Sequence, residues 1–390
     1  MRRPGLFLIG LITFVFNLGG GVIAPAVPLY ARSLGGDYQD LGLIGASHGL
    51  AFALLTIPLG RASDRFGRRA LLLLSALAVG GAAALYAVST HIVGLAVAKV
   101  LEAAGWATFW PALEAWVAEA FQARAGMVMG LAYGAYAASF VVGTSAAGFI
   151  IEAAGLRMPF LVYLGTAVLA LGLSLAVPGG REPGRHGHAV TTTVTRLPGG
   201  EPRHARGQRV LAYGTGFVYV FGLGTVLAFL PAYAADRGLS PRGVGLLLGG
   251  YWTARVAGSL AAGRVSDALG RRAVLVPAMV IAGVAGLLTA APAAVALLVL
   301  GTLGLGLTAG ASAPTCVGLI ADHVAPASRG MAMGLFEASC GGSILTAGLV
   351  GGAAAQQIGA ASPYVVVAGL ALAWSLVLAR RLSSRAPAGG

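Results

Sequence analysis

Lysine is almost absent from this chain of 390 residues, since Lys99 is the single lysine and arginine supplies the other fixed positive charges. Acidic residues are also few, with 13 Asp and Glu, and charged residues of both signs make up only 10% of the chain. Soluble domains carry about 25%. With 57% hydrophobic residues and a mean hydropathy of +0.83, this scarcity of charge excludes a soluble globule.

Several functional signatures are also missing. No Walker loop is present, so ATP is not the expected energy source. His186 and His188 lack a third ligand and predict no metal site. Cys316 and Cys340 lie in predicted apolar helices, and we assign them no disulfide. A membrane enzyme or a channel would need a catalytic constellation or a continuous polar pore, and the sequence shows neither, so we expect no enzyme and no cofactor.

Long apolar segments dominate what is present. A membrane-spanning helix needs about 20 mostly apolar residues, and twelve segments qualify: 5–31, 41–60, 70–89, 92–118, 126–152, 158–178, 210–235, 242–262, 273–291, 293–321, 329–356 and 361–379. They predict an all-α membrane protein made of two pseudo-symmetric six-helix bundles, at 1–178 and 210–382. A polar, flexible linker at 179–209 would join the bundles, and a cytoplasmic tail would occupy 383–390.

The same charged tag occurs twice, as Gly60-Arg-Ala-Ser-Asp-Arg-Phe-Gly-Arg-Arg69 and Gly263-Arg-Val-Ser-Asp-Ala-Leu-Gly-Arg-Arg272, at a spacing of 263 − 60 = 203 residues. Tyr30 and Tyr233 match at the same offset. The repetition predicts a duplicated bundle. Each tag is expected to form a loop of about ten residues between two spans. Its glycines, Asp and arginines are Gly60, Arg61, Asp64, Arg65, Gly67, Arg68, Gly263, Asp267, Gly270 and Arg271.

The tag resembles motif A of the major facilitator superfamily, which lies between helices 2 and 3 and again between helices 8 and 9. This resemblance implies a twelve-helix transporter with a central cavity lined by helices 1, 4, 7 and 10. It also implies that Asp64 faces the positive N-terminal end of helix 11, an electrostatic latch that favours the outward-facing state. The alternative is that the arginines act as a topology signal only, and the two interpretations are compatible.

Two further segments resemble the drug/proton antiporters of that superfamily. Lys99 stands at the Arg position of their motif B, and Pro25-x-x-Pro28-Leu-Tyr in the first span is found in drug-efflux members. The fifth span departs from their motif C, because the proline is missing and Ser139 and Ala147 replace glycines. This departure weakens the antiport interpretation.

The arginines also predict the orientation. If both termini are cytoplasmic, the inner segments hold 20 arginines and the outer loops hold 4, as the positive-inside rule requires. We therefore expect a multi-pass protein of the inner (plasma) membrane with cytoplasmic termini. The net charge of +13 is then a topology signal, and no nucleic-acid partner is expected.

Ionisable side chains inside a span are costly and mark functional sites. Four stand out: Lys99, Glu102, Arg255 and Glu337. The spacing of Lys99, Glu102, Trp106 and Trp110 predicts one helix face. Lys99 and Glu102 are candidates for proton coupling, with Glu337 as a third. The alternative is an ion pair that only neutralises two buried charges. A contact between Arg255 and Glu337 would be either a structural pair or a site for substrate or protons.

These features predict a secondary active transporter that exports a small, partly apolar compound in exchange for protons. The aromatic and polar residues expected to line its substrate cavity are Asn17, Trp106, Trp110, Tyr133, Tyr136, Tyr219 and Arg255. The alternative is uptake or facilitated diffusion of a small metabolite, and an anionic one could use Lys99 and Arg255. The expected partners are the substrate, protons and the lipid bilayer, and a monomer is expected.

Overall fold

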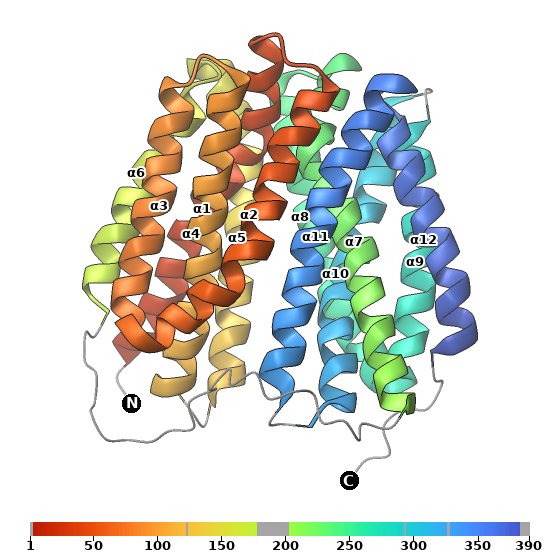
Figure 1. The fold of residues 1–390 in the computed structure, drawn as a ribbon. Coiled ribbons are helices and arrows are strands. Elements are labelled where there is room, and N and C mark those ends of the chain that lie inside the picture. The colour runs from red at the N-terminus through yellow and green to blue at the C-terminus, as the bar shows by residue number, and fades with distance from the viewer. Residues whose placement is uncertain (1–2, 122–123, 178–202, 292–293, 326–327, 383–390) are drawn as a thin grey trace. The chain divides into compact units, whose positions relative to one another are not determined.

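The computed structural model describes residues 3–121, 124–177, 203–291, 294–325 and 328–382. These residues form twelve α-helices and no strand (Figure 1). Within a bilayer a helix satisfies all of its own backbone hydrogen bonds, which accounts for this uniformity. The helices are α1 Arg3–Ser33, α2 Tyr38–Phe66, α3 Arg68–Val88, α4 Ile92–Ala120, α5 Ala125–Ala154, α6 Met158–Leu175, α7 Arg203–Asp236, α8 Pro241–Leu269, α9 Arg271–Ala290, α10 Val295–His323, α11 Arg329–Gln357 and α12 Ser362–Arg381.

The prediction of twelve helices is confirmed, and among the described residues ten are long and apolar enough to cross a membrane. The other two are α2 and α8. Helix α8 carries Arg255 near its middle, and α2 has Gln39 and Asp40 near its start. Helix α7 begins at Arg203, inside the range predicted as linker.

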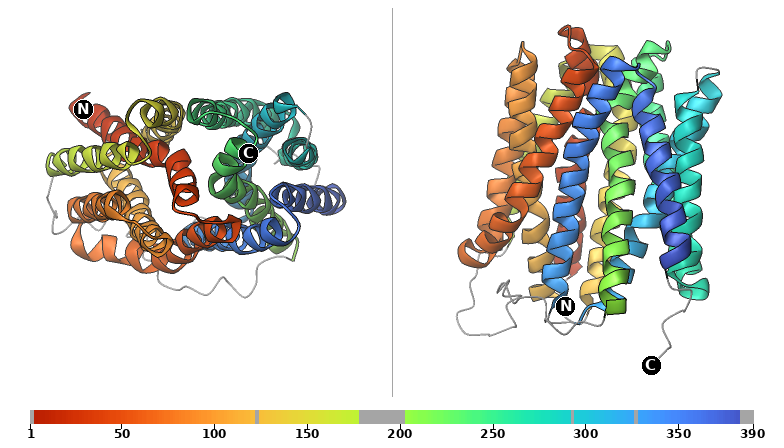
Figure 2. Two further views of the ribbon diagram at one scale, coloured as in Figure 1. Left: turned by 90° about the horizontal axis from the view of Figure 1, so that it is seen from above. Right: turned by 45° about the vertical axis from the view of Figure 1, so that its right-hand side comes forward.

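Contacts divide the chain into two compact units. Unit 1 comprises residues 1–36, 50–191 and 238–249, and unit 2 comprises residues 37–49, 192–237 and 250–390. In unit 1, α1 packs against α5 and α6, and α3 packs against α4 and α6. In unit 2, α7 packs against α11 and α12, and α9 against α10 and α12. These contacts recur six helices later (Figure 2), as a duplicated chain predicts, but α7 also packs closely against α10.

The duplication extends to the helix ends. The Tyr30 hydroxyl donates a hydrogen bond to the Ser89 carbonyl oxygen at 2.8 Å and accepts one from Arg157 Nε at 2.9 Å. In the other half, the Tyr233 hydroxyl donates to the Thr289 carbonyl oxygen at 3.2 Å and accepts from Arg237. Each tyrosine thus satisfies a carbonyl at the C-terminal end of α3 or α9, where the helix itself offers no donor.

The two tags are not the ten-residue loops that the sequence predicted. Helix α2 continues to Phe66 and α8 to Leu269, so each tag is largely helical and is broken at one glycine. Those glycines, Gly67 and Gly270, have φ angles of +85° and +84°. A side chain would be strained in this conformation, and glycine adopts it freely. The prediction was wrong because it ended each helix where the apolar sequence ends.

Close helix packing in unit 1 depends on glycines where α1 crosses α5. A Cβ atom added to Gly143 would lie 2.7 Å from the Leu18 carbonyl oxygen and 2.9 Å from the Val22 nitrogen. Both atoms belong to the backbone of α1 and cannot rotate away. Small residues at such crossings let lipid-embedded helices approach closely.

Replacing Gly143 with alanine should therefore push α1 and α5 apart. We expect Gly143→Ala to destabilise the protein by about 1–3 kcal/mol, the usual cost of overpacking, measured as a lower unfolding midpoint of the purified protein in detergent. Gly134→Ala is the control on the same helix, because a Cβ there meets no atom within 4 Å. It should leave the midpoint unchanged or raise it, since alanine favours helix. Equal midpoints for the two variants would contradict this packing argument.

Candidate functional site

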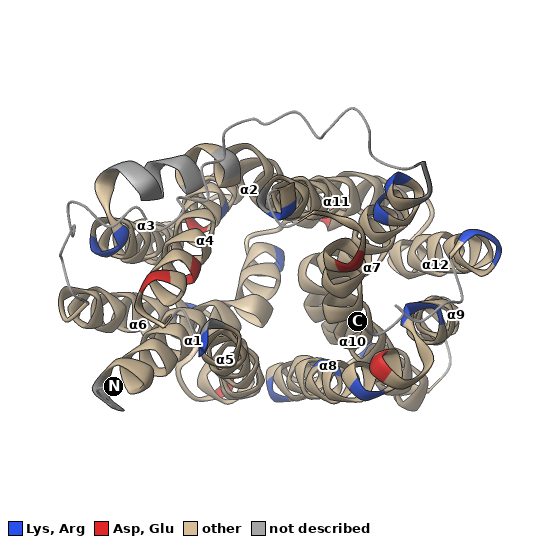
Figure 3. Cartoon of the chain, turned by 90° about the horizontal axis from the view of Figure 1, so that it is seen from below, with Lys and Arg blue, Asp and Glu red and all other residues tan. Residues whose placement is uncertain are grey.

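The structure brings together the predicted ion pair on α4. Lys99 Nζ lies 2.9 Å from both Oε1 and Oε2 of Glu102. The Glu102 side chain is 5% exposed and the Lys99 side chain 19%. Both residues belong to unit 1, on a helix whose end view shows several acidic residues (Figure 3). An ion pair this buried is tolerated only when its charges are matched and hydrogen-bonded.

A third residue, Tyr86 of α3, completes this site, and the sequence analysis missed it. Its hydroxyl donates to Glu102 Oε2 at 2.8 Å, and the side chain is fully buried. The carboxylate therefore accepts bonds from one cation and one neutral donor. No spacing rule links residues on different helices, so only the fold reveals this contact.

Tyr163 of α6 and Trp106 of α4 lie nearby. The Tyr163 hydroxyl interacts electrostatically with Glu102 and lies close to Trp106, yet neither it nor Trp106 Nε1 has a hydrogen bond of acceptable geometry. Gly19 and Gly20 of α1 make room for these rings, since a Cβ at either position would overlap Tyr163 or Trp106. Two buried donors thus lie beside the ion pair without a well-formed hydrogen bond.

The predicted aromatic residues of α4 and α5 form one cluster. Trp110 stacks on Tyr133 with ring centroids 5.0 Å apart and 14° between the planes. Tyr136 meets Trp110 edge to face at 5.5 Å and Trp106 at 6.1 Å. Tyr133 is 49% exposed, and its hydroxyl donates to Glu114 Oε1 at 3.2 Å. Glu114 is a second residue that the sequence analysis missed, although it lies inside the span predicted at 92–118.

Asn17 occupies a different environment from the one expected. Its side chain is fully buried in α1, and its amide Nδ2 donates to the Thr13 carbonyl oxygen at 2.7 Å. Its Oδ1 has no hydrogen-bond partner. In this placement Asn17 therefore lines no accessible surface.

In unit 2, three predicted residues share one neighbourhood. Tyr219 of α7 lies within electrostatic range of both Arg255 and Glu337. The Arg255 guanidinium lies 4.9 Å from the centre of the Trp252 ring, in a cation–π arrangement. Direct contact between Arg255 and Glu337 stays a prediction. Cys316 and Cys340 are buried and free, as expected for a chain without an assigned disulfide.

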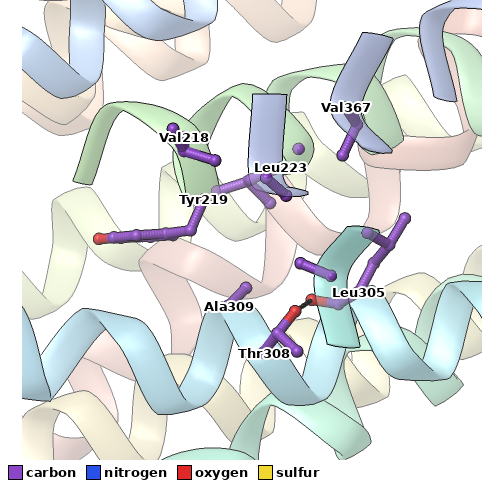
Figure 4. Close-up of a pocket in the computed structure, with 10 residues that line it drawn as sticks. Val218, Tyr219, Leu223, Leu305, Thr308, Ala309 and Val367 are labelled. Carbon is purple, nitrogen blue, oxygen red and sulfur yellow. Dashed lines mark hydrogen bonds between the residues drawn. The ribbon is translucent and has the colours of Figure 1, made fainter. Parts of the chain in front are cut away.

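Tyr219 also borders a small cavity among α7, α9, α10 and α12 (Figure 4). Thr308 and Leu305 of α10 line its floor. Its volume is about 10 Å³, enough for roughly one water molecule. Substrate sites need several hundred Å³, so this cavity holds no substrate as it stands.

In each unit, one described ion pair joins the tag to a distant helix. Arg68 pairs with Glu119 of α4 at 2.6 Å, and Arg271 pairs with Asp322 of α10 at 3.1 Å. Both pairs join residues 51 apart in the sequence. They fix the start of α3 to the end of α4, and the start of α9 to the end of α10.

Of the two tag aspartates, Asp64 and Asp267, the structure describes the side-chain contacts of Asp267. Asp267 lies 3.8 Å from Arg271 and is 82% exposed, and an exposed pair of this kind contributes about 0–1 kcal/mol. For the first tag, the structure describes the helical backbone of 60–65 but not the side chains of Arg61, Asp64 and Arg65 or the surroundings of Gly60. Gly263 is in α8, and a Cβ there would meet no atom within 4 Å.

Metal ligands do not gather in the described part of the chain. No group of three or more His, Cys, Asp or Glu residues there could hold a metal ion. His186 and His188 lie outside the described residues.

Comparison with known families gives a consistent result. The sequence profile of the Major Facilitator Superfamily matches residues 9–211 and again residues 212–389. The chain is 30% identical over 159 residues to "Multidrug resistance protein 2" of Bacillus subtilis, a match that covers 40% of this chain and 39% of that protein. It is 28% identical over 159 residues to an uncharacterized MFS-type transporter of Methanocaldococcus jannaschii, covering 40% and 41%. The matched segments thus span about two-fifths of these relatives.

Solved structures share the fold over the whole chain. A nucleoside transporter superimposes with a TM-score of 0.82 at 12% identity, covering 97% of this chain and all of the other. A D-xylose–proton symporter gives 0.79 at 16% identity, covering 97% and 98%. At such identities the likeness concerns the fold alone.

The geometry around Glu102 predicts different roles for two buried tyrosine hydroxyls. Tyr86→Phe removes a donor to a buried carboxylate, and we expect a loss of about 1–3 kcal/mol of stability, read as a lower unfolding midpoint. Tyr163→Phe removes a hydroxyl that forms no satisfactory hydrogen bond, so its midpoint should stay the same or rise. If Tyr163→Phe destabilises the protein as much as Tyr86→Phe, the assignment of Tyr86 as the partner of Glu102 is wrong.

Proposed function

Since this chain belongs to the Major Facilitator Superfamily, whose profile matches both of its halves, we propose that it exports small, partly apolar compounds in exchange for protons. It is a multi-pass membrane transporter. The single observation that carries the proton-coupled part of the proposal is the buried site formed by Lys99, Glu102 and Tyr86. The name of one relative, "Multidrug resistance protein 2", favours the transport of drug-like compounds.

Glu102 is the proton carrier in this proposal. When it is ionised, it accepts hydrogen bonds from Lys99 and Tyr86. Protonation removes its negative charge, breaks the ion pair and leaves the Lys99 ammonium without its counter-ion in a region of low dielectric constant. This large electrostatic change biases the protein toward a second conformation.

The substrate-binding surface includes the aromatic cluster of α4 and α5. Trp110, Tyr133 and Tyr136 offer ring faces with few hydrogen-bonding groups. Such a surface suits a partly apolar compound, whereas a sugar would need more hydrogen-bonding partners. Transport then follows alternating access.

The proposed location is the inner (plasma) membrane, with both termini in the cytoplasm. The distribution of 20 arginines against 4 supports this orientation. Uptake of a metabolite is the competing function. The direction in which substrate moves relative to protons distinguishes export from uptake. In liposomes with an imposed pH gradient, export by antiport moves substrate and protons in opposite directions, whereas symport moves them together.

The proton-carrier role of Glu102 gives a specific expectation. Glu102→Gln keeps the size of the side chain and its contact with Tyr86 but loses the ionisable proton. We expect gradient-driven transport to disappear in proteoliposomes, while substrate counterflow without a gradient continues. Counterflow is the control for folding and binding. Uphill transport at the wild-type rate across the pH range would exclude Glu102 as the carrier and direct attention to Glu337.

The latch formed by the first tag gives a second expectation. Asp64→Asn should slow transport severely without loss of expression, and should shift the accessibility of engineered cysteines away from the outward-facing pattern. Asp267→Asn should be milder, because Asp267 forms only an exposed pair with Arg271 and Ala268 stands where the first tag has Arg65. Equal defects in both variants, or no defect in either, would refute the latch.

A further inference from the structure

Glu114 is an acidic residue on α4 without a basic partner among the described residues. Helix α4 carries three glutamates: Glu102 pairs with Lys99, Glu119 pairs with Arg68, and Glu114 accepts one hydrogen bond, from the Tyr133 hydroxyl at 3.2 Å. Its side chain is exposed and lies six residues before the end of the helix. The distance from that end is about 9 Å at ~1.5 Å per residue.

An exposed carboxylate inside an apolar span faces water or a ligand, since lipid would leave its charge unsolvated. The two exposed glutamates of α4, Glu114 and Glu119, differ in whether a basic residue pairs with them. Glu119 is neutralised within the protein by Arg68. Glu114 has no basic partner among the described residues, and its printed contact is with the neutral Tyr133 hydroxyl. Its carboxylate can therefore pair with a positively charged group of a ligand.

Aromatic rings lie directly beside this charge. Tyr133 hydrogen-bonds to Glu114 through its hydroxyl, and its ring stacks on Trp110 at 5.0 Å. Tyr136 closes the cluster with its edge against Trp110 at 5.5 Å. Stacking on one side leaves the Tyr133 side chain 49% exposed. The faces of such rings carry negative electrostatic potential and attract cations.

We propose that Glu114, Tyr133 and Trp110 form a binding site for an organic cation, an amine or quaternary ammonium group attached to an aromatic or aliphatic body. The cationic group lies against the Glu114 carboxylate, and the apolar body packs on the exposed face of Tyr133. The Tyr133 hydroxyl orients the carboxylate. This site rests on the proposed function and narrows its substrate class from partly apolar compounds to cationic ones.

The same arrangement disfavours other ligands. A metal ion would require several oxygen ligands, and no cluster of three candidate ligands occurs among the described residues. An anionic metabolite would be repelled by Glu114, so the site argues against the anionic version of the uptake alternative. A sugar would find few hydrogen-bonding groups beside the rings.

Equilibrium binding to the purified full chain in nanodiscs tests the proposal without any proton gradient. The probe is radiolabelled phenethyltrimethylammonium, and the competitor is its neutral isostere with carbon in place of the nitrogen. The wild type should bind the cation at least about tenfold more tightly than the isostere, the difference expected for one charge-assisted contact. Equal affinities for the two compounds would overturn the proposal.

Two substitutions separate the charge from the rings. Glu114→Gln should weaken cation binding by about tenfold or more and leave the isostere unaffected. Tyr133→Leu should weaken both compounds, because it removes the ring surface. Glu119→Gln is the matched control, since it removes a carboxylate five residues along the same helix, and it should bind the cation like the wild type. Wild-type cation binding by Glu114→Gln, or an equal loss in Glu119→Gln, would refute the site.

Failure of this site can be told apart from failure of the proposed function. If the cation does not bind but another apolar compound drives proton flux in proteoliposomes, proton-coupled export stands and the cation site is wrong. If the cation binds through Glu114 and its movement is independent of the pH gradient, the site stands and proton coupling is wrong.

Discussion

The cost of an unpaired charge in hydrocarbon is the constraint on which the rest of this structure depends. It explains why charged residues make up only 10% of the chain and why α4 holds the ammonium of Lys99 against both oxygens of Glu102. It also explains the polar side chains inside the helices. Thr13, Thr144 and Thr215 each donate to the carbonyl four residues earlier, so their hydroxyls are satisfied within one helix.

The two halves of the chain satisfy this constraint with matching contacts at their helix ends. The tyrosine at the end of α1 and the one at the end of α7 each bond to a terminal carbonyl and an arginine. Arg68 and Arg271 each pair with an acid 51 residues later. The halves differ inside the spans: α4 has an ion pair between i and i+3, and the second half places Arg255 and Glu337 on separate helices, α8 and α11. Architecture is therefore repeated, and the interior chemistry is specific to each half.

The sequence predicted the fold well and the site in part, for physical reasons. Apolar length determined the twelve helices, because a span must be long and apolar, but it ended α2 and α8 too early, since a helix can continue past the lipid. Periodicity predicted the Lys99–Glu102 contact, which lies within one helix. It could not predict Tyr86, whose contact depends on how α3 packs against α4. Glu114 met the criterion of an ionisable group within a span, but only the fold revealed that no basic residue in the described part of the chain pairs with it.

The contrast between Glu102 and Glu114 fits the different tasks that we propose for these two acids of α4. Glu102 is buried and paired with Lys99, so an organic cation would have to displace Lys99 to reach it. A proton is small enough to reach Glu102 through a chain of hydrogen bonds. Glu114 is exposed, lies next to aromatic rings and has no basic partner where the side chains are described. It suits a ligand that brings its own positive charge and apolar surface. At about 18 Å apart along α4, the acids do not share a ligand, so any coupling between proton and substrate must pass through the conformation of the helix and its neighbours.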